Sequence, residues 1–265
     1  MMNAGHLKNF SIPLIAPLLV LILWEMTTVQ LGLFPKSLVP SPGEVGISIY
    51  ELLRDDILQN HISASLVRVI KGFLIATILG LSLGIWMGLS KTVDKFLGRF
   101  LDALRQIPSM AWIPLIILWF GIGETSKVVI IAKTAFFPIL LNTIQGIRST
   151  QKEHIELARM FELDNTKVLT HVIFPSALPN IFVGLRLALG FSWMVVVAAE
   201  QIAAKSGVGY MIEVGRELAR PEVIIVGMVV IGIIGVIMDF GLRRLELYSL
   251  KWRRTFEGDY GGITI

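Results

Sequence analysis

The chain lacks cysteine altogether and is poor in charged residues and in histidine. Without cysteine it can form no disulfide, no thiol nucleophile and no cysteine-ligated metal site. Its four histidines fall in no spacing typical of zinc ligation or of a serine–histidine–acid arrangement. The stretch 84–92 ends in Gly-Leu-Ser-Lys-Thr but lacks the Gly-Lys pair of a phosphate-binding loop. We therefore expect no catalytic residue, metal or cofactor in this chain.

Apolar residues dominate what remains. Of 265 residues, 54% are hydrophobic and only 17% are charged, which is typical of an integral membrane protein. A helix needs about 20 mostly apolar residues to cross the bilayer. Six runs meet that length, near residues 10–33, 66–89, 100–121, 127–147, 178–201 and 222–242. The sequence thus predicts an all-α integral membrane fold with six transmembrane helices.

We expect one membrane domain over residues 1–265, with a core at 60–245 and the run 10–33 as an additional N-terminal helix. No small-residue cleavage site follows that first run, so we interpret it as a retained anchor. A cleaved signal peptide is the alternative.

Basic residues concentrate in alternate loops. They follow the second run (Lys91, Lys95, Arg99), the fourth (Arg148, Lys152, Arg159, Lys167) and the sixth (Arg243, Arg244, Lys251, Arg253, Arg254). Cytoplasmic loops carry such an excess, so these loops and both termini are predicted to face the cytoplasm. The opposite loops also hold basic residues: Lys36, Arg54, Lys205, Arg216 and Arg220. We interpret the net charge of +4 as a topology signal and expect no nucleic-acid partner.

Glycine and proline mark two of the predicted spans and one external segment. In the second span, glycines recur every four residues, at Gly80, Gly84 and Gly88, which predicts a smooth helix face for close packing. In the third span, Pro108 and Pro114 predict a kink that serves either a gate or packing. After Pro42, residues 43–59 are predicted to form an amphipathic external helix.

The loop between the fourth and fifth spans is predicted to be helical. Thr150 and Glu153 fit a capping box, which predicts a helix that starts near Gln151. Ile155, Ala158 and Phe161 recur at three-residue spacing and give this helix an apolar stripe. Such a short helix is marginal in water unless it packs against something.

A second short helix is predicted to follow, capped by Asp164 or Asn165 and ended at the membrane by Pro175 and Pro179. The two helices would form a compact lever attached to the fifth span. The alternative is an ordinary loop that lies on the bilayer surface.

This loop resembles the conserved loop of bacterial ABC importer permeases. That pattern is Glu-Ala-Ala, three residues, Gly, nine residues, then Ile-x-Leu-Pro; Glu156, Ala158 and Pro175 are in register, with Val172 at the isoleucine position. Three positions depart from it: Leu157 for alanine, Glu162 for glycine and Phe174 for leucine. Glycine would allow a positive φ that glutamate tolerates poorly, so we expect the turn to be distributed over Asp164 and Asn165.

The resemblance extends over almost the whole chain, and it points to permeases of the nitrate, sulfonate and taurine importers. The matching stretches are Pro40-Ser41-Pro42, Ser65-Leu66-Val67-Arg68-Val69, Arg105-Gln106-Ile107-Pro108, Trp112-Ile113-Pro114-Leu115, Trp119-Phe120-Gly121-Ile122-Gly123, Gly184-Leu185-Arg186, Ala199-Glu200 and Gly207-Val208-Gly209-Tyr210. The resemblance implies a type I importer fold in the bacterial inner membrane and transport of a small anion, with aliphatic sulfonates first, then taurine and nitrate.

It also implies partners: a second permease copy, two cytoplasmic ATPase subunits that bind ATP and Mg, and an external solute-binding protein. The loop would be the coupling helix that docks on the ATPase. Its residues would be Glu156, Leu157, Ala158, Arg159, Phe161, Glu162, Asp164 and Pro175.

Several charged residues lie within the predicted spans, where a charge is costly. Lys133 either attracts an anionic substrate or snorkels outward. Arg186 and Asp239 lie at similar depth and are predicted to form a structural or gating ion pair, and Glu200 is assigned to helix packing or an outer gate. Our candidates for the substrate path or gate are Lys133, Arg105, Pro108, Trp193 and Glu200.

Two other functions compete with the importer. A secondary transporter would show an internal repeat and coupling residues near the midplane, but no convincing repeat relates the two halves. A membrane enzyme would need a polar catalytic cluster at one interface, and the sequence offers none.

Overall fold

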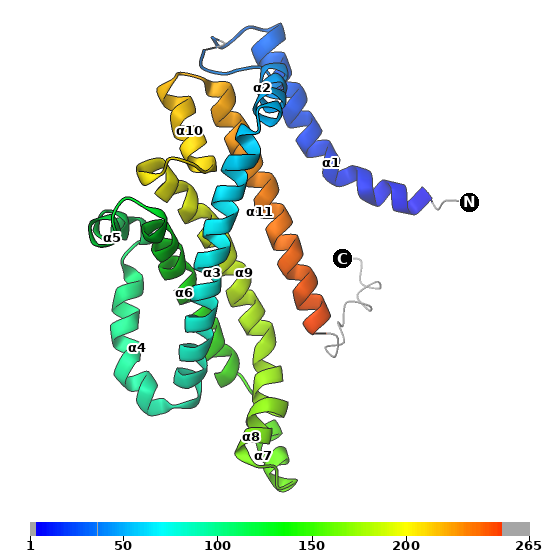
Figure 1. Cartoon of the computed structure of the whole chain (residues 1–265). Coiled ribbons are helices and arrows are strands. Elements are labelled where there is room, and N and C mark those ends of the chain that lie inside the picture. Colours follow the sequence, from blue (N-terminus) through cyan, green and yellow to red (C-terminus); the bar gives the residue numbers. More distant parts are fainter. Residues whose placement is uncertain (1–3, 36, 251–265) are drawn as a thin grey trace. The chain divides into compact units, whose positions relative to one another are not determined.

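A computed structural model describes residues 4–35 and 37–250, with side chains from residue 15 onward. Every regular element among the described residues is a helix (Figure 1). In chain order the elements are α1 (Ala4–Glu25), η1 (Met26–Gln30), α2 (Pro42–Arg54), α3 (Ile57–Leu89), α4 (Lys91–Gln106), η2 (Ser109–Trp112), α5 (Ile113–Phe120), α6 (Glu124–Arg148), α7 (Lys152–Met160), α8 (Asn165–Val168), η3 (Leu169–Ile173), α9 (Phe174–Ala203), α10 (Val208–Glu217) and α11 (Pro221–Ser249). Lys36 and the basic residues from Lys251 on, used in the topology prediction, lie outside the described residues.

The chain divides into two compact units, which we describe separately. The first comprises the residues up to Ser65 together with Glu200–Gly232, and the second comprises Leu66–Ala199 together with the residues from Ile233 on.

Four helical segments are long and apolar enough to cross a membrane. They are Ile57–Leu89, Glu124–Arg148, the continuous stretch Asn165–Ala203 and Pro221–Ser249. A fifth span exists if α4 and Ser109–Phe120, which meet at a 90° bend, are counted as one. The apolar helix Ile15–Gln30, inside the predicted first span, is shorter. The chain is therefore an all-helical membrane protein, and the count of six spans is not confirmed.

The predicted third span, residues 100–121, is not one helix. It breaks where Ile107 adopts an extended conformation (φ −78°, ψ 116°) immediately before Pro108. Proline disfavours helical geometry in the residue before it and has no N–H to donate. The expected kink is therefore a complete break.

In the first unit, the predicted external helix is α2. Ser41 caps it with a capping box: the Ser41 hydroxyl accepts from the Glu44 N–H at 3.2 Å, and the Glu44 carboxylate accepts from the Ser41 N–H at 2.8 Å. The helix ends at Arg54, earlier than predicted, because Asp56 has a left-handed φ of 57°. The next helix, α3, therefore starts at Ile57 and not at residue 66.

Also in the first unit, α10 has 10 residues and is too short to cross a membrane. A hydrogen bond from Arg216 lowers the pKa of the Glu213 carboxyl near the end of this helix. Earlier in the chain, the Trp24 indole donates to the Pro40 carbonyl at 3.0 Å and ties the segment before α2 to α1.

In the second unit, α3 and α6 pack through the predicted glycine face. A Cβ atom at Gly80 would lie 3.0 Å from Ile139 Cβ, and one at Gly84 would lie 2.7 Å from Thr143 Cβ. Gly88 is equally close to Ile147, at 2.8 Å. Small residues at a helix interface allow such close approach, so the predicted packing role of this face is confirmed.

Candidate functional site

The loop between α6 and α9 forms the predicted helix pair. The first helix, α7, starts at Lys152 as expected, but the predicted capping box is wrong. Gln151 occupies the N-cap position without a side-chain hydrogen bond. Thr150 therefore lies one residue outside the helix, and its hydroxyl is buried without a hydrogen-bond partner among the described residues.

The turn after α7 is made at Glu162, which has a φ of 55°. The Glu162 N–H donates to the Arg159 carbonyl at 2.9 Å, and the Leu163 N–H donates to the Ala158 carbonyl at 3.2 Å. This is the Schellman arrangement that usually places glycine in the left-handed position. The prediction of a turn distributed over Asp164 and Asn165 is therefore wrong.

Asp164 instead caps the second helix of the pair. Its backbone is extended, and its carboxylate accepts from the Lys167 N–H at 3.2 Å. The predicted helix end at Pro175 and Pro179 is wrong, because α8, η3 and α9 form one continuous helical stretch of 39 residues, Asn165–Ala203. The ring of a helical proline clashes with the carbonyl four residues earlier; for Pro175 that residue is His171, which lies in the wider π-turn η3.

Large apolar side chains are exposed at the end of α7. Leu157, Met160 and Phe161 are 54%, 80% and 74% exposed, whereas Ala158 is buried within the pair. A hollow of about 430 Å³ lies between α7 and the start of the long helix, with Leu157, Phe161, Val172 and Pro175 among its lining residues. The remaining members of the predicted coupling set, Glu156, Arg159, Glu162 and Asp164, are exposed.

A larger cavity, of about 760 Å³, lies among α4, α6 and α9. Three of the five path candidates line it: Lys133, Arg105 and Pro108. The Lys133 ammonium donates to the Ile107 carbonyl at 3.3 Å and to the Ser109 hydroxyl at 3.4 Å. It also lies 5.2 Å above the ring of Trp112 and 5.8 Å from that of Phe137, a cation–π arrangement.

The two cationic side chains that line the cavity differ in whether a carboxylate lies close enough to neutralise them. The Arg105 guanidinium forms an ion pair with Asp102 at 3.0 Å. No carboxylate of the described residues lies within ion-pair distance of Lys133, whose contacts are a carbonyl, a hydroxyl and two aromatic rings. Lys133 is therefore a cation within a membrane helix that has only neutral partners.

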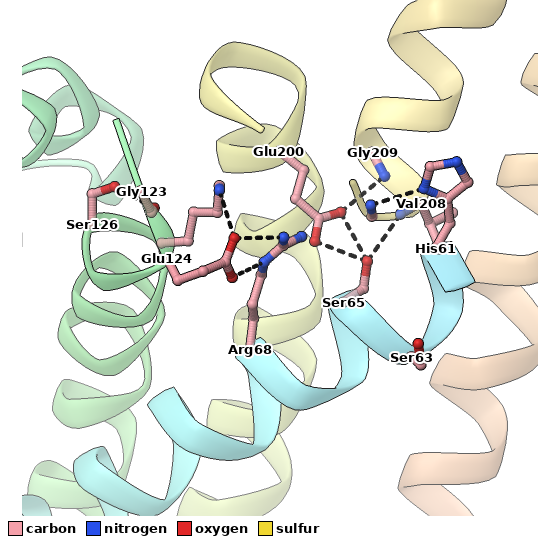
Figure 2. A network of polar contacts seen from close by, with 12 residues as sticks. His61, Ser63, Ser65, Arg68, Gly123, Glu124, Ser126, Glu200, Val208 and Gly209 are labelled. Carbon is pink, nitrogen blue, oxygen red and sulfur yellow. Dashed lines mark hydrogen bonds and ion pairs between the residues drawn. The ribbon is translucent and has the colours of Figure 1, made fainter. Parts of the chain in front are cut away.

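The other two path candidates are buried. Trp193 is 6% exposed, lies beside Gly235 of α11 and does not line the cavity. Glu200, in the first unit, is fully buried. Its carboxylate accepts from the Ser65 hydroxyl at 2.8 and 2.9 Å and from the Gly209 N–H at 3.0 Å (Figure 2).

Further polar residues around Glu200 carried no assigned role in the sequence analysis. Ser65 also accepts from the Val208 N–H at 2.9 Å, and His61 accepts from the Gly207 N–H at 3.0 Å. The start of α10 is thus tied to α3 and to Glu200 by backbone amides. Ser65 and Glu200 are 135 residues apart in the chain, so no local spacing could reveal the contact.

In the second unit, charged side chains join Arg68 to the start of α6. The Arg68 guanidinium, almost fully buried, donates twice to the Glu124 carboxylate, at 2.6 and 2.7 Å, and Lys127 donates to the same carboxylate at 3.0 Å (Figure 2). Arg68 stood in one of the stretches that carried the family resemblance, which was the only signal for it.

The structure also brings Arg186 and Asp239 together. The Arg186 guanidinium donates to both Asp239 oxygens, at 3.0 and 3.1 Å, and lies 3.7 Å from Glu246. The two-bond geometry is the strong form of an arginine–carboxylate pair.

The described residues define a helical membrane protein with an exposed helix pair, and comparison with known proteins gives its family. The model of the family "Binding-protein-dependent transport system inner membrane component" matches residues 76–247. The chain belongs to this family, and the resemblance inferred from its motifs is confirmed. It is therefore a membrane component of a binding-protein-dependent transport system.

Its relatives narrow the group. The chain is 38% identical over 245 residues to the "Putative aliphatic sulfonates transport permease protein SsuC" of Bacillus subtilis (strain 168), a match covering 92% of this chain and 88% of that protein. It is 36% identical over 249 residues to the taurine transport system permease protein TauC of Escherichia coli (strain K12), covering 92% and 90%.

A solved structure shares the fold. The inward-facing MetNI methionine ABC transporter matches with a TM-score of 0.60 at 16% identity, over 72% of this chain and 95% of that chain. This likeness concerns the fold alone.

Proposed function

We propose that this chain forms the transmembrane pathway of an ATP-driven importer for a small anion, with an aliphatic sulfonate as its substrate. Taurine, nitrate or a related small solute is the alternative substrate. The names of the relatives support this choice. In the proposed assembly, two copies of the chain associate with two cytoplasmic ATPase subunits, which bind ATP and Mg, and with an extracytoplasmic solute-binding protein.

The observation that carries the mechanism is the exposed helix pair at the start of the 39-residue helical stretch. This pair exposes an apolar surface, which is typical of a site where another protein binds. Its three large side chains are Leu157, Met160 and Phe161. The ATPase is proposed to dock there, so that its closure on ATP moves α7 and α8 and, with them, α9. Coupling then results from the different affinity of the partners for two conformations of the permease.

This docking requires α7 to face the cytoplasm. We accordingly place the chain in the bacterial inner membrane with both termini on the cytoplasmic side, as the basic loops predict. Glu156, Arg159 and Glu162 would form the polar rim of the dock.

Lys133 supports an anionic substrate. A charge within a membrane helix needs a counter-charge, water or an interface, and the described part of the chain supplies Lys133 with no carboxylate. We assign Lys133 and Arg105 to the path of the anion. Glu200 is assigned to holding the start of α10 in place, and Arg186 with Asp239 to a structural ion pair.

The substrate test is ATP hydrolysis in liposomes that contain this chain, its ATPase and candidate binding proteins, each loaded with an alkanesulfonate, taurine or nitrate. Stimulation by a loaded binding protein would support the importer and identify its solute. Uptake by this chain with no ATPase present would overturn the proposal in favour of a secondary transporter.

The docking test is a pair of substitutions on the apolar surface, Met160→Glu with Phe161→Glu. We expect insertion to be retained and the ATPase to be lost from the purified complex. Thr166→Glu, which adds a charge to α8 instead, is the matched control and should retain the ATPase. Equal copurification in all variants would contradict the assigned dock. Because Ala158 is buried in the pair, replacing it would disturb the pair itself and would not test the surface.

The path test is Lys133→Ala. Removing the ammonium should reduce uptake of the anion and leave assembly with the ATPase unchanged. Full uptake by this variant would exclude Lys133 from the path.

A further inference from the structure

The cavity of the second unit combines a cationic end with apolar walls. On α6, Lys133, Phe137 and Leu141 follow one another at four-residue intervals and so share one face of the helix. The interval from Lys133 to Leu141 covers about 12 Å along the helix axis at 1.5 Å per residue. The cavity lining thus extends along α6, and Lys133 is the lining residue of this face that is nearest to the start of the helix.

The facing wall comes from α9 and is apolar as well. Leu187, Phe191 and Met194 are spaced by four and three residues, which also places them on one helix face. They are 46%, 43% and 62% exposed, so no other described residue covers this wall fully.

The cationic end of the cavity can donate further hydrogen bonds to a ligand. An ammonium carries three N–H donors, and Lys133 uses two of them in long contacts of 3.3 and 3.4 Å. The Ser109 hydroxyl and the Arg105 guanidinium also line the cavity. An oxyanion at this end would gain charge-assisted hydrogen bonds, whereas a lipid-facing apolar groove would have no reason to hold an unneutralised lysine.

We propose that this cavity is a binding site within the permease for an amphiphilic monoanion, an alkanesulfonate. Lys133 and Ser109 receive the sulfonate group, and the walls of α6 and α9 receive the alkyl chain. The permease itself, and not only the binding protein, then selects its solute. This inference rests on the proposed function and adds a substrate preference to it.

The same geometry disfavours the alternative solutes. Nitrate has no apolar part, so it would leave both walls in contact with water. Taurine carries an ammonium group at the far end of its short chain, and the described lining of the cavity holds no carboxylate to neutralise that charge. The predicted order of affinity is therefore a longer alkanesulfonate, then methanesulfonate, then taurine and nitrate.

The test measures binding to the permease–ATPase complex in lipid nanodiscs without any binding protein. Displacement of radiolabelled hexanesulfonate by methane-, ethane- and butanesulfonate and by nitrate gives relative affinities. Each added methylene should tighten binding about two- to fourfold, since burying a methylene is favourable. Lys133→Met should weaken hexanesulfonate binding at least tenfold, and Lys133→Arg, which keeps the charge, should restore much of it.

Two further variants test the walls. Phe191→Ser and Leu141→Ser should flatten the dependence on chain length while methanesulfonate binding changes little. Lys95→Met, which removes a cation of α4 outside this cavity, is the matched control and should bind like the unmodified complex. Partition into lipid is insensitive to Lys133, so only the lysine-dependent part of the signal counts.

The inference is overturned if hexanesulfonate shows no lysine-dependent binding, or if the chain-length series is unchanged in both wall variants. If a loaded binding protein still stimulates ATP hydrolysis in that case, the importer function stands and only the intramembrane site is wrong. If stimulation is absent as well, the proposed function fails with it.

Discussion

Replacing Gly84 by alanine tests a close helix contact in the second unit. The new Cβ would lie 2.7 Å from Thr143 Cβ, 2.9 Å from Thr143 Cγ2 and 3.1 Å from the Leu140 carbonyl oxygen. Two of these atoms belong to or adjoin the α6 backbone, so no rotamer change relieves the overlap, and α6 has to shift. Overpacking of this kind costs about 1–3 kcal/mol.

The change also has a favourable part, because alanine is a better helix former than glycine by about 1 kcal/mol. Gly241→Ala in α11 isolates that part, since a Cβ at Gly241 meets nothing within 4 Å. The difference between the two variants is therefore the packing term. At about 2–4 °C per kcal/mol for a chain of this size, and about 2 kcal/mol of overpacking, Gly84→Ala should unfold about 4–8 °C below Gly241→Ala.

Thermal unfolding of the purified complex, followed in one detergent for both variants, gives this difference. A double variant with Thr143→Gly should recover part of the loss, because it removes the atoms that the new methyl group meets, and the coupling can be read from a double-mutant cycle. Equal melting temperatures for Gly84→Ala and Gly241→Ala would refute the close packing of α3 on α6.

Three other predictions concern the turn after α7, the start of α10 and the ion pair of the long helix. Glu162→Gly should relieve about 1 kcal/mol of left-handed strain and slow hydrogen exchange of the α7 amides about fivefold, whereas Glu162→Val should speed it; identical exchange in both would contradict the turn. Gly207→Ala should strongly destabilise the protein, because its φ is 117° and a Cβ there would overlap the Glu200 carboxylate, and wild-type stability in a denaturant titration would exclude that contact. Asp239→Asn should lower stability, and the reversed pair Arg186→Asp with Asp239→Arg should restore part of it; a reversed pair no more stable than the single variant would show that the two side chains do not interact.

Features with one local cause were predictable from the sequence. Glycines every four residues in an apolar helix allow few interpretations besides close packing, and Gly80, Gly84 and Gly88 do face α6. The cap of α8 at Asp164 also follows from a short-range rule. These rules work because the groups involved are within one helical turn of each other.

The predictions failed where two local rules competed, and no prediction was possible where the contacting residues are far apart in the sequence. Proline predicted helix ends at Pro175 and Pro179, but a π-turn accommodates the first, and the helix continues. Glutamate was expected to avoid the left-handed region, yet Glu162 adopts it because two backbone hydrogen bonds of a Schellman turn hold it there. The contact of Ser65 with Glu200 depends on tertiary structure alone.

The π-turn η3 also sets the rotational position of α8 relative to α9. A π-turn holds one residue more than an α-helical turn between its hydrogen-bonded groups, and each residue of an α-helix advances the side-chain direction by about 100°. Deleting Thr170 would convert the turn to α-helix and rotate α8 by about that angle about the axis of α9. The direction in which the helix pair presents Phe161 thus depends on a single inserted residue.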